Sequence, residues 1–193
     1  MKFTTRNIFS LGLITLCGLV CSGIMGLLRY GGDLFDSTSP AFAFLSFGLS
    51  GSFIFAFYHV RGLSETITTA VAVSTVQFVV ALGWITMLNA GIWSFGVNLP
   101  VVILAFLFER KLATLRRAKF LFVAAMYGAG FVILSLISGW LVGLEHMPAV
   151  AFRENFVDGL LLGLGVGLGI ELGEAFADSL LHYGTPGTAA VRS

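Results

Sequence analysis

Apolar residues in this chain form long continuous runs, without the alternation with polar residues that marks the surface helices of soluble proteins. Crossing about 30 Å of hydrocarbon takes about 20 helical residues at about 1.5 Å each, so run length is the better guide to a membrane helix. Six runs approach or exceed that length, at about 8–28, 41–60, 67–88, 92–108, 120–144 and 156–181. The pattern predicts an all-α, polytopic integral membrane protein, with residues 1–193 forming one compact bundle of six transmembrane helices.

Three connections between these runs carry recognisable turn or helix signals. Ser39 and Pro40 suit the N-cap and first turn of the second helix, and Asn155 is a plausible cap for the sixth. The tight turn at residues 89–91 leads into a run that contains Pro100, so we expect the fourth helix to be kinked there. A partial, interfacial segment followed by a short helix is the alternative.

Composition supports a membrane protein and excludes several other classes. The chain is 57% hydrophobic and 11% charged, with a mean hydropathy of +0.95. These values lie far outside the range of soluble domains. The net charge of +1 gives no indication of nucleic-acid binding.

The positions of the basic residues predict how the chain is oriented. If the N-terminus is cytoplasmic, Arg29 and Arg153 are the only ones of the eleven Lys and Arg residues that fall outside. Cytoplasmic loops of membrane proteins carry an excess of Lys and Arg, so we expect both termini in the cytoplasm. The interpretation places the protein in a plasma membrane, the inner membrane of a bacterium.

The sixth predicted helix is rich in glycine. Its glycines form two ladders at four-residue spacing, Gly159, Gly163, Gly167 and Gly165, Gly169, Gly173. At about 100° per residue the two ladders lie on nearly opposite sides of a helix. Small residues allow membrane helices to pack backbone to backbone, so we expect this helix to be central in the bundle.

The first glycine ladder continues along the same helix face as a stripe of carboxylates, Glu171, Glu174 and Asp178, followed by His182. Only twelve uncharged residues separate Asp158 from Glu171, too few to cross the hydrocarbon. An ionisable group inside a membrane is costly, so it marks a functional site by default. The stripe therefore predicts an ion or proton pathway.

A displaced helix is the alternative interpretation of the stripe. If the helix is shifted so that Asp158 is buried, Glu171 reaches the cytoplasmic interface and the acids pair with Arg61 or with Arg116 and Arg117. On the third helix, Gln77 and Ser74 interrupt an apolar run near the middle of the membrane. With His182, they are the accessory polar residues we expect near the acids, although such residues also serve as interhelical contacts.

The sequence gives little support for catalysis or for cofactor binding. Gly48-Leu49-Ser50-Gly51 resembles the GxSG motif of rhomboid intramembrane proteases, but His182, the potential base, is predicted at a different depth from Ser50. Three scattered histidines do not form a haem or zinc site, so no cofactor is expected. Cys17 and Cys21 are interpreted as small packing residues, and nothing positively indicates an enzyme.

The sequence thus favours a small membrane transporter or channel that handles a cation or is coupled to protons. One alternative is a substrate-binding subunit of a multicomponent transporter, because six helices and cytoplasmic termini are similar in outline to the S-components of energy-coupling-factor transporters. Gly18, Ser22 and Gly26 are the face expected to dock in that case. Another is a structural or assembly subunit, whose partners are other membrane subunits or copies of itself.

Overall fold

The computed structural model describes residues 4–36, 39–61, 63–83, 119–141 and 149–183. Within these ranges the chain forms five helices and no strand: α1 (Thr5–Tyr30), α2 (Pro40–Arg61), α3 (Leu63–Gly83), α5 (Lys119–Leu141) and α6 (Ala149–Tyr183). The expectation of an all-α protein is confirmed for this part of the chain. The predicted fourth helix, with its kink at Pro100, lies outside the described residues.

Four helices are long and apolar enough to cross a membrane: α1, α2, the segment Phe120–Ile137 of α5 and the segment Ala151–Leu180 of α6. Large apolar side chains, such as those of Leu16, Leu28 and Trp140, are exposed on these helices. Exposed apolar surface of this extent suits lipid better than water. The protein is therefore membrane-embedded.

The helix ends correct two of the sequence predictions. The sixth helix was expected to begin near Phe156, but α6 begins at Ala149 and continues to Tyr183. Asn155 is consequently no cap: it lies inside α6, and its Nδ2 donates to Ser135 Oγ on α5 at 2.7 Å. Ser39 does cap α2, because its Oγ accepts from the Ala41 backbone N–H at 3.2 Å.

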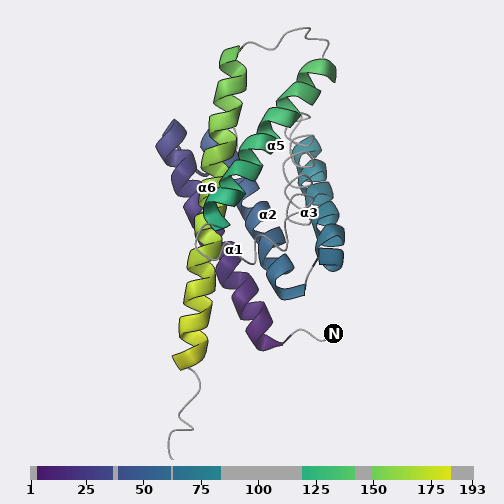
Figure 1. Cartoon of the computed structure of the whole chain (residues 1–193). Coiled ribbons are helices and arrows are strands. Elements are labelled where there is room, and N and C mark those ends of the chain that lie inside the picture. The colour runs from purple at the N-terminus through teal and green to yellow at the C-terminus, as the bar shows by residue number, and fades with distance from the viewer. Residues whose placement is uncertain (1–3, 37–38, 62, 84–118, 142–148, 184–193) are drawn as a thin grey trace, which may run out of the picture.

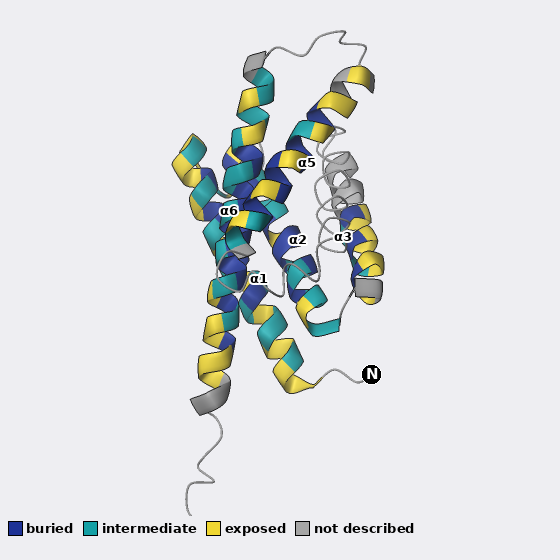
Figure 2. Ribbon diagram, in the orientation of Figure 1, coloured by how far each residue is buried: buried dark blue, intermediate teal, exposed yellow. Residues whose placement is uncertain are grey.

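The described helices pack around α6, which runs the length of the molecule in Figure 1. α6 contacts α1, α5 and α2, whereas α3 packs against α2. Most of the dark blue, buried segments in Figure 2 lie where α1, α2, α5 and α6 meet, and α3 has a smaller buried face of its own. Tyr127, Leu162 and Val166 are fully buried in this core.

The two glycine ladders of α6 lie against two different helices. Gly159, Gly163 and Gly167 face α5, and a Cβ added at Gly163 would lie 2.7 Å from Ala124 Cα. The other ladder faces α1, and a Cβ added at Gly165 would lie 2.6 Å from Ser22 Cα. Real side chains do not fit at such distances, so both interfaces depend on direct backbone contact.

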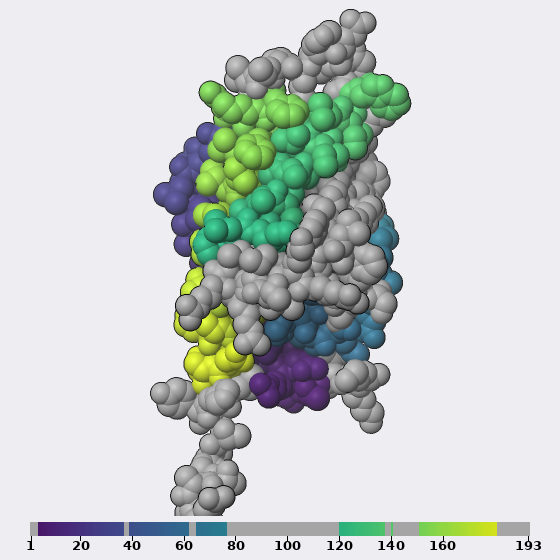
Figure 3. Space-filling model, viewed as in Figure 1, coloured from purple at the N-terminus to yellow at the C-terminus, as the bar shows by residue number. Residues whose placement is uncertain are grey.

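The same contacts fix the axial register of the helices. Along α1, Gly169 lies opposite Gly18 and Gly173 lies opposite Ile14. Along α5, Gly159 lies opposite Gly128 and Gly167 lies opposite Phe120, the second residue of that helix. α5 therefore begins beside the middle of α6, and its first residues lie level with the middle of α1. Figure 3 shows the same stagger, with α5 beside only part of α6.

Candidate functional site

The stagger of α1 and α5 places two carboxylates of α6 level with the middles of two candidate membrane-spanning helices. Glu171 lies between Gly169 and Gly173, which contact Gly18 and Ile14, so it is level with the middle of α1. Asp158 precedes Gly159, which contacts Gly128, so it is level with the middle of α5. Whichever of the two helices is centred in the bilayer, one of these acids lies near the centre.

The distance between the two acids leads to the same conclusion. Asp158 and Glu171 are thirteen residues apart on one continuous helix, which corresponds to about 20 Å at about 1.5 Å per residue. The hydrocarbon core is about 30 Å thick. Both acids cannot lie outside it, and an intermediate position of α6 places each acid inside, on opposite sides of the centre.

Glu171 binds the start of α5. Its Oε1 accepts from the Phe120 backbone N–H at 3.4 Å. The first N–H groups of a helix have no partner within the helix, so a carboxylate there satisfies a donor and interacts favourably with the helix dipole. Glu171 is half-buried, and its position depends on close contact between Gly167 and Phe120.

Glu174, one turn further along α6, contacts α2. Its Oε1 lies 3.3 Å from His59 Nδ1, and the two side chains are 23% and 53% exposed. α2 ends at Arg61, so His59 belongs to its last turn. This helix runs antiparallel to α1. The sequence analysis did not bring His59 together with the stripe; the position of both residues near helix ends was the available signal.

The remaining predicted site residues are less closely grouped. Asp178 is exposed on the last described turns of α6. Ser74 is buried on α3, which packs on α2 instead of α6. The side chains of Gln77 and His182 lie outside the described residues, as do Arg116 and Arg117. Arg61 forms an ion pair with Glu65 of α3 at 3.6 Å.

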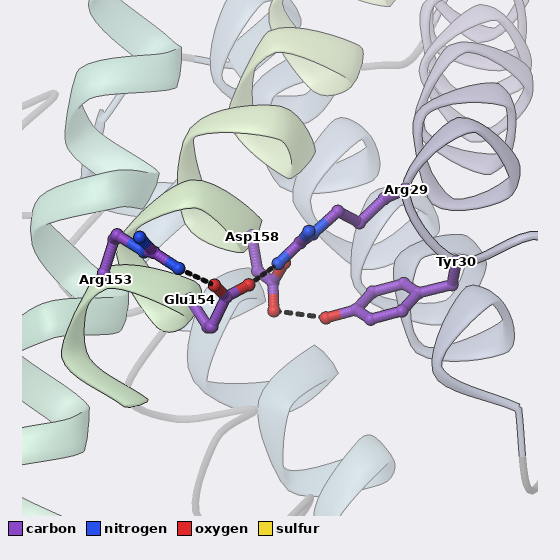
Figure 4. Close-up of polar contacts among 5 residues, drawn as sticks. All are labelled: Arg29, Tyr30, Arg153, Glu154 and Asp158. Carbon is purple, nitrogen blue, oxygen red and sulfur yellow. Dashed lines mark hydrogen bonds and ion pairs between the residues drawn. The ribbon is translucent and has the colours of Figure 1, made fainter. Parts of the chain in front are cut away.

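A second polar site, which we call the Arg29 cluster, comprises Arg29, Tyr30, Arg153, Glu154 and Asp158 (Figure 4). Arg29 Nε donates to Asp158 Oδ1 at 2.8 Å, and Arg29 Nη2 donates to Glu154. The Tyr30 hydroxyl donates to the other oxygen of Asp158. Arg153 Nη2 donates to Glu154 Oε1 at 3.0 Å. Two guanidinium groups thus balance two carboxylates, and Asp158 is only 9% exposed.

The sequence analysis missed this cluster because it placed residues 145–155 in a loop. Since α6 begins at Ala149, Glu154 and Asp158 are one turn apart on the same helix face. Arg29, in the last turn of α1, then lies opposite them. The spacing of Glu154 and Asp158, together with an arginine at the end of the first apolar run, was the signal that could have found it.

A close-packed, apolar segment of α6 separates the two sites. Leu162 and Val166 are fully buried there, and Ile170 is 7% exposed. The hydroxyl of Tyr127 lies against Gly51 in this region and, in the part of the chain that the structure describes, has no hydrogen-bond partner. This segment, about three and a half helical turns long, separates the two ionisable sites.

Metal binding finds no support among the described residues, because no three His, Cys, Asp or Glu side chains gather there in a way that could hold an ion. Cys17 and Cys21 are free thiols. Comparison of the chain with protein-family models, curated proteins and solved structures gave no match. The functional argument therefore depends on the two sites themselves.

Proposed function

We propose that the protein is a small membrane transporter or channel that handles protons or a cation through the carboxylates of α6, Glu171, Glu174 and Asp178. The observation that supports the proposal is the position of Glu171 level with the middle of α1, a candidate membrane span. A carboxylate at such a depth is costly unless it exchanges a proton or binds a cation. Permanent burial of an unneeded charge would only destabilise the bundle.

The contact between Glu174 and His59 supports the proton version of this function. Imidazole is the side chain that changes charge at physiological pH, and it exchanges protons with groups within hydrogen-bond distance. His59 Nδ1 and Glu174 Oε1 lie 3.3 Å apart, close to that distance. Because His59 lies in the last turn of α2, it would connect the carboxylates with the medium at that end of the bundle.

The full topology belongs to the same proposal. We expect six membrane spans with both termini in the cytoplasm, which places Glu174 and His59 on the cytoplasmic side and the Arg29 cluster on the outer side. The location would be the inner membrane of a bacterium. With this orientation, a proton or cation leaving Glu171 reaches the cytoplasm through Glu174 and His59.

The alternatives retain less structural support. Gly18, Ser22 and Gly26, the face expected to dock a coupling subunit, are buried against α2 and α6 of the same chain. The glycines of α6 are likewise occupied by α1 and α5. A substrate-binding subunit and an assembly subunit stay predictions, but each would need a different surface for its partner.

Proton flux in proteoliposomes tests the proposal. Purified protein is reconstituted with an internal pH-sensitive dye, and flux is measured under an imposed membrane potential. We expect Glu171→Gln and Glu174→Gln to reduce flux to the level of protein-free liposomes. A neutral amide cannot take up and release a proton as a carboxylate does. Glu65→Gln, the same change at an exposed acid of α3, is the matched control. A flux at the wild-type level in both α6 variants, with intact folding, would overturn the proposal.

If wild-type protein carries no proton flux, the same variants are compared for uptake of sodium and potassium ions.

A further inference from the structure

We infer that the Arg29 cluster holds the last turns of α1 against α6, so that breaking it releases this end of α1 while the opposite end stays in place. The cluster joins two side chains at the end of α1, Arg29 and Tyr30, to two on the first turns of α6, Glu154 and Asp158. The inference concerns the resting structure and holds whether or not the protein transports ions.

The glycine ladder of α6 holds the middle of α1 but does not reach its end. Gly165, Gly169 and Gly173 contact Ser22, Gly18 and Ile14 at distances that leave no room for a side chain. These contacts stop at Ser22, whereas α1 continues to Tyr30. A separate contact is needed to hold the last turns of α1 against α6.

The polar contacts of α6 with its neighbours are unevenly distributed. In the described part of the chain, the side-chain hydrogen bonds between α1 and α6 all come from Arg29 and Tyr30. Toward its other end, α6 is linked to α5 through Glu171 and to α2 through Glu174. α1 thus has its polar attachment to α6 at one end only.

The contacts of the Arg29 cluster depend on one another, because Arg29 takes part in most of them. Arg29 uses separate nitrogens for Glu154 and Asp158, which lie one turn apart and would repel each other without it. Its guanidinium carbon lies 5.3 Å from the centre of the Tyr30 ring, and that ring packs edge-on against Phe44 of α2. Loss of Arg29 would leave the carboxylate of Asp158, whose side chain is 12% exposed, without its cation, which is unfavourable.

Electron paramagnetic resonance distance measurements in liposomes test the inference. One pair of spin labels replaces the exposed residues Leu28 on α1 and Phe156 on α6, near the cluster, and a second replaces Leu16 and Leu172, further along the same helices. We expect Arg29→Gln to broaden and lengthen the first distance distribution and to leave the second unchanged. Arg153→Gln is the matched control, because Arg153 contacts Glu154 on its own helix and does not reach α1.

A milder variant keeps the test decisive if Arg29→Gln fails to fold. Tyr30→Phe removes one donor to Asp158 and retains the ring against Phe44, so we expect a smaller broadening of the Leu28–Phe156 distance. Unchanged distributions for that pair in every folded variant would overturn the inference. Equal broadening of both pairs would also overturn it, because that result indicates general loosening of α1 instead of release at one end.

Discussion

At the scale of single residues, two tyrosine hydroxyls show opposite relations to their surroundings. The Tyr30 hydroxyl donates to the buried carboxylate of Asp158, whereas the Tyr127 hydroxyl is fully buried against Gly51 with no partner among the described residues. A hydrogen bond to a charged group stabilises a fold. An unpaired buried hydroxyl loses its hydrogen bonds to water and forms none in the protein, which destabilises the fold. The same substitution should therefore have opposite effects at the two positions.

We predict that Tyr30→Phe lowers the free energy of unfolding by about 1 kcal/mol, below the usual range for a bond to a charged group because Tyr30 is partly exposed. Tyr127→Phe should leave stability unchanged or raise it by about 1 kcal/mol. Unfolding of the purified variants in mixed detergent micelles, followed by circular dichroism, measures both. A destabilised Tyr127→Phe variant beside a neutral Tyr30→Phe variant would contradict the assigned hydrogen bond.

At the scale of helices, α6 combines unusual length with glycines on the two faces that contact α1 and α5. Its 35 residues correspond to about 52 Å, well beyond one hydrocarbon thickness. α1 and α5 cover different parts of that length, and each is positioned by a separate glycine ladder. The glycines therefore do more than permit close packing: they set the depths at which Asp158 and Glu171 lie.

Alanine substitutions test this function of the glycines. A Cβ at Gly163 would lie 2.7 Å from both Ala124 Cα and the Val123 carbonyl oxygen, so α5 and α6 must separate. We predict that Gly163→Ala lowers the free energy of unfolding by about 1–3 kcal/mol, the usual cost of overpacking. Gly12→Ala is the matched control, because nothing lies within 4 Å of its added Cβ.

The control should move in the opposite direction. Alanine is favoured over glycine in a helix by up to about 1 kcal/mol, so Gly12→Ala should be neutral or stabilising. Thermal unfolding in the same detergent compares the two variants. If both have the same effect, the contact between α5 and α6 is looser than the structure shows.

Local patterns predicted the helices and their faces better than their contacts. Run length identified α1 and α2 to within three residues, and spacing alone separated the two glycine ladders. The start of α6 was wrong because Arg153 and Glu154 look like loop residues until Arg29 is placed beside them. His59 beside Glu174, and the Phe120 amide beside Glu171, are likewise contacts between distant parts of the chain. Such contacts depend on tertiary packing, which no local pattern contains.

At the scale of the whole molecule, the proposed orientation makes a prediction about access from the two sides of the membrane. In a variant without the native Cys17 and Cys21, Phe35→Cys places a thiol in the exposed connection between α1 and α2, and Thr5→Cys places one at the opposite end of α1. We expect a membrane-impermeant thiol reagent to label Phe35→Cys in intact cells and to label Thr5→Cys only after lysis. The reverse pattern would invert the topology and place Glu174 and His59 on the outer side.

The central claim is that the carboxylate of Glu171 exchanges a proton or cation inside the membrane. The most direct measurement compares the flux of Glu171→Gln and Glu171→Asp proteoliposomes prepared in one batch with wild-type protein. Gln preserves the shape of the side chain and can still contact the Phe120 amide, but it cannot ionise; Asp retains the charge on a shorter side chain. We predict no flux above protein-free liposomes for Glu171→Gln and partial flux for Glu171→Asp. Wild-type flux in a correctly folded Glu171→Gln variant would contradict the claim.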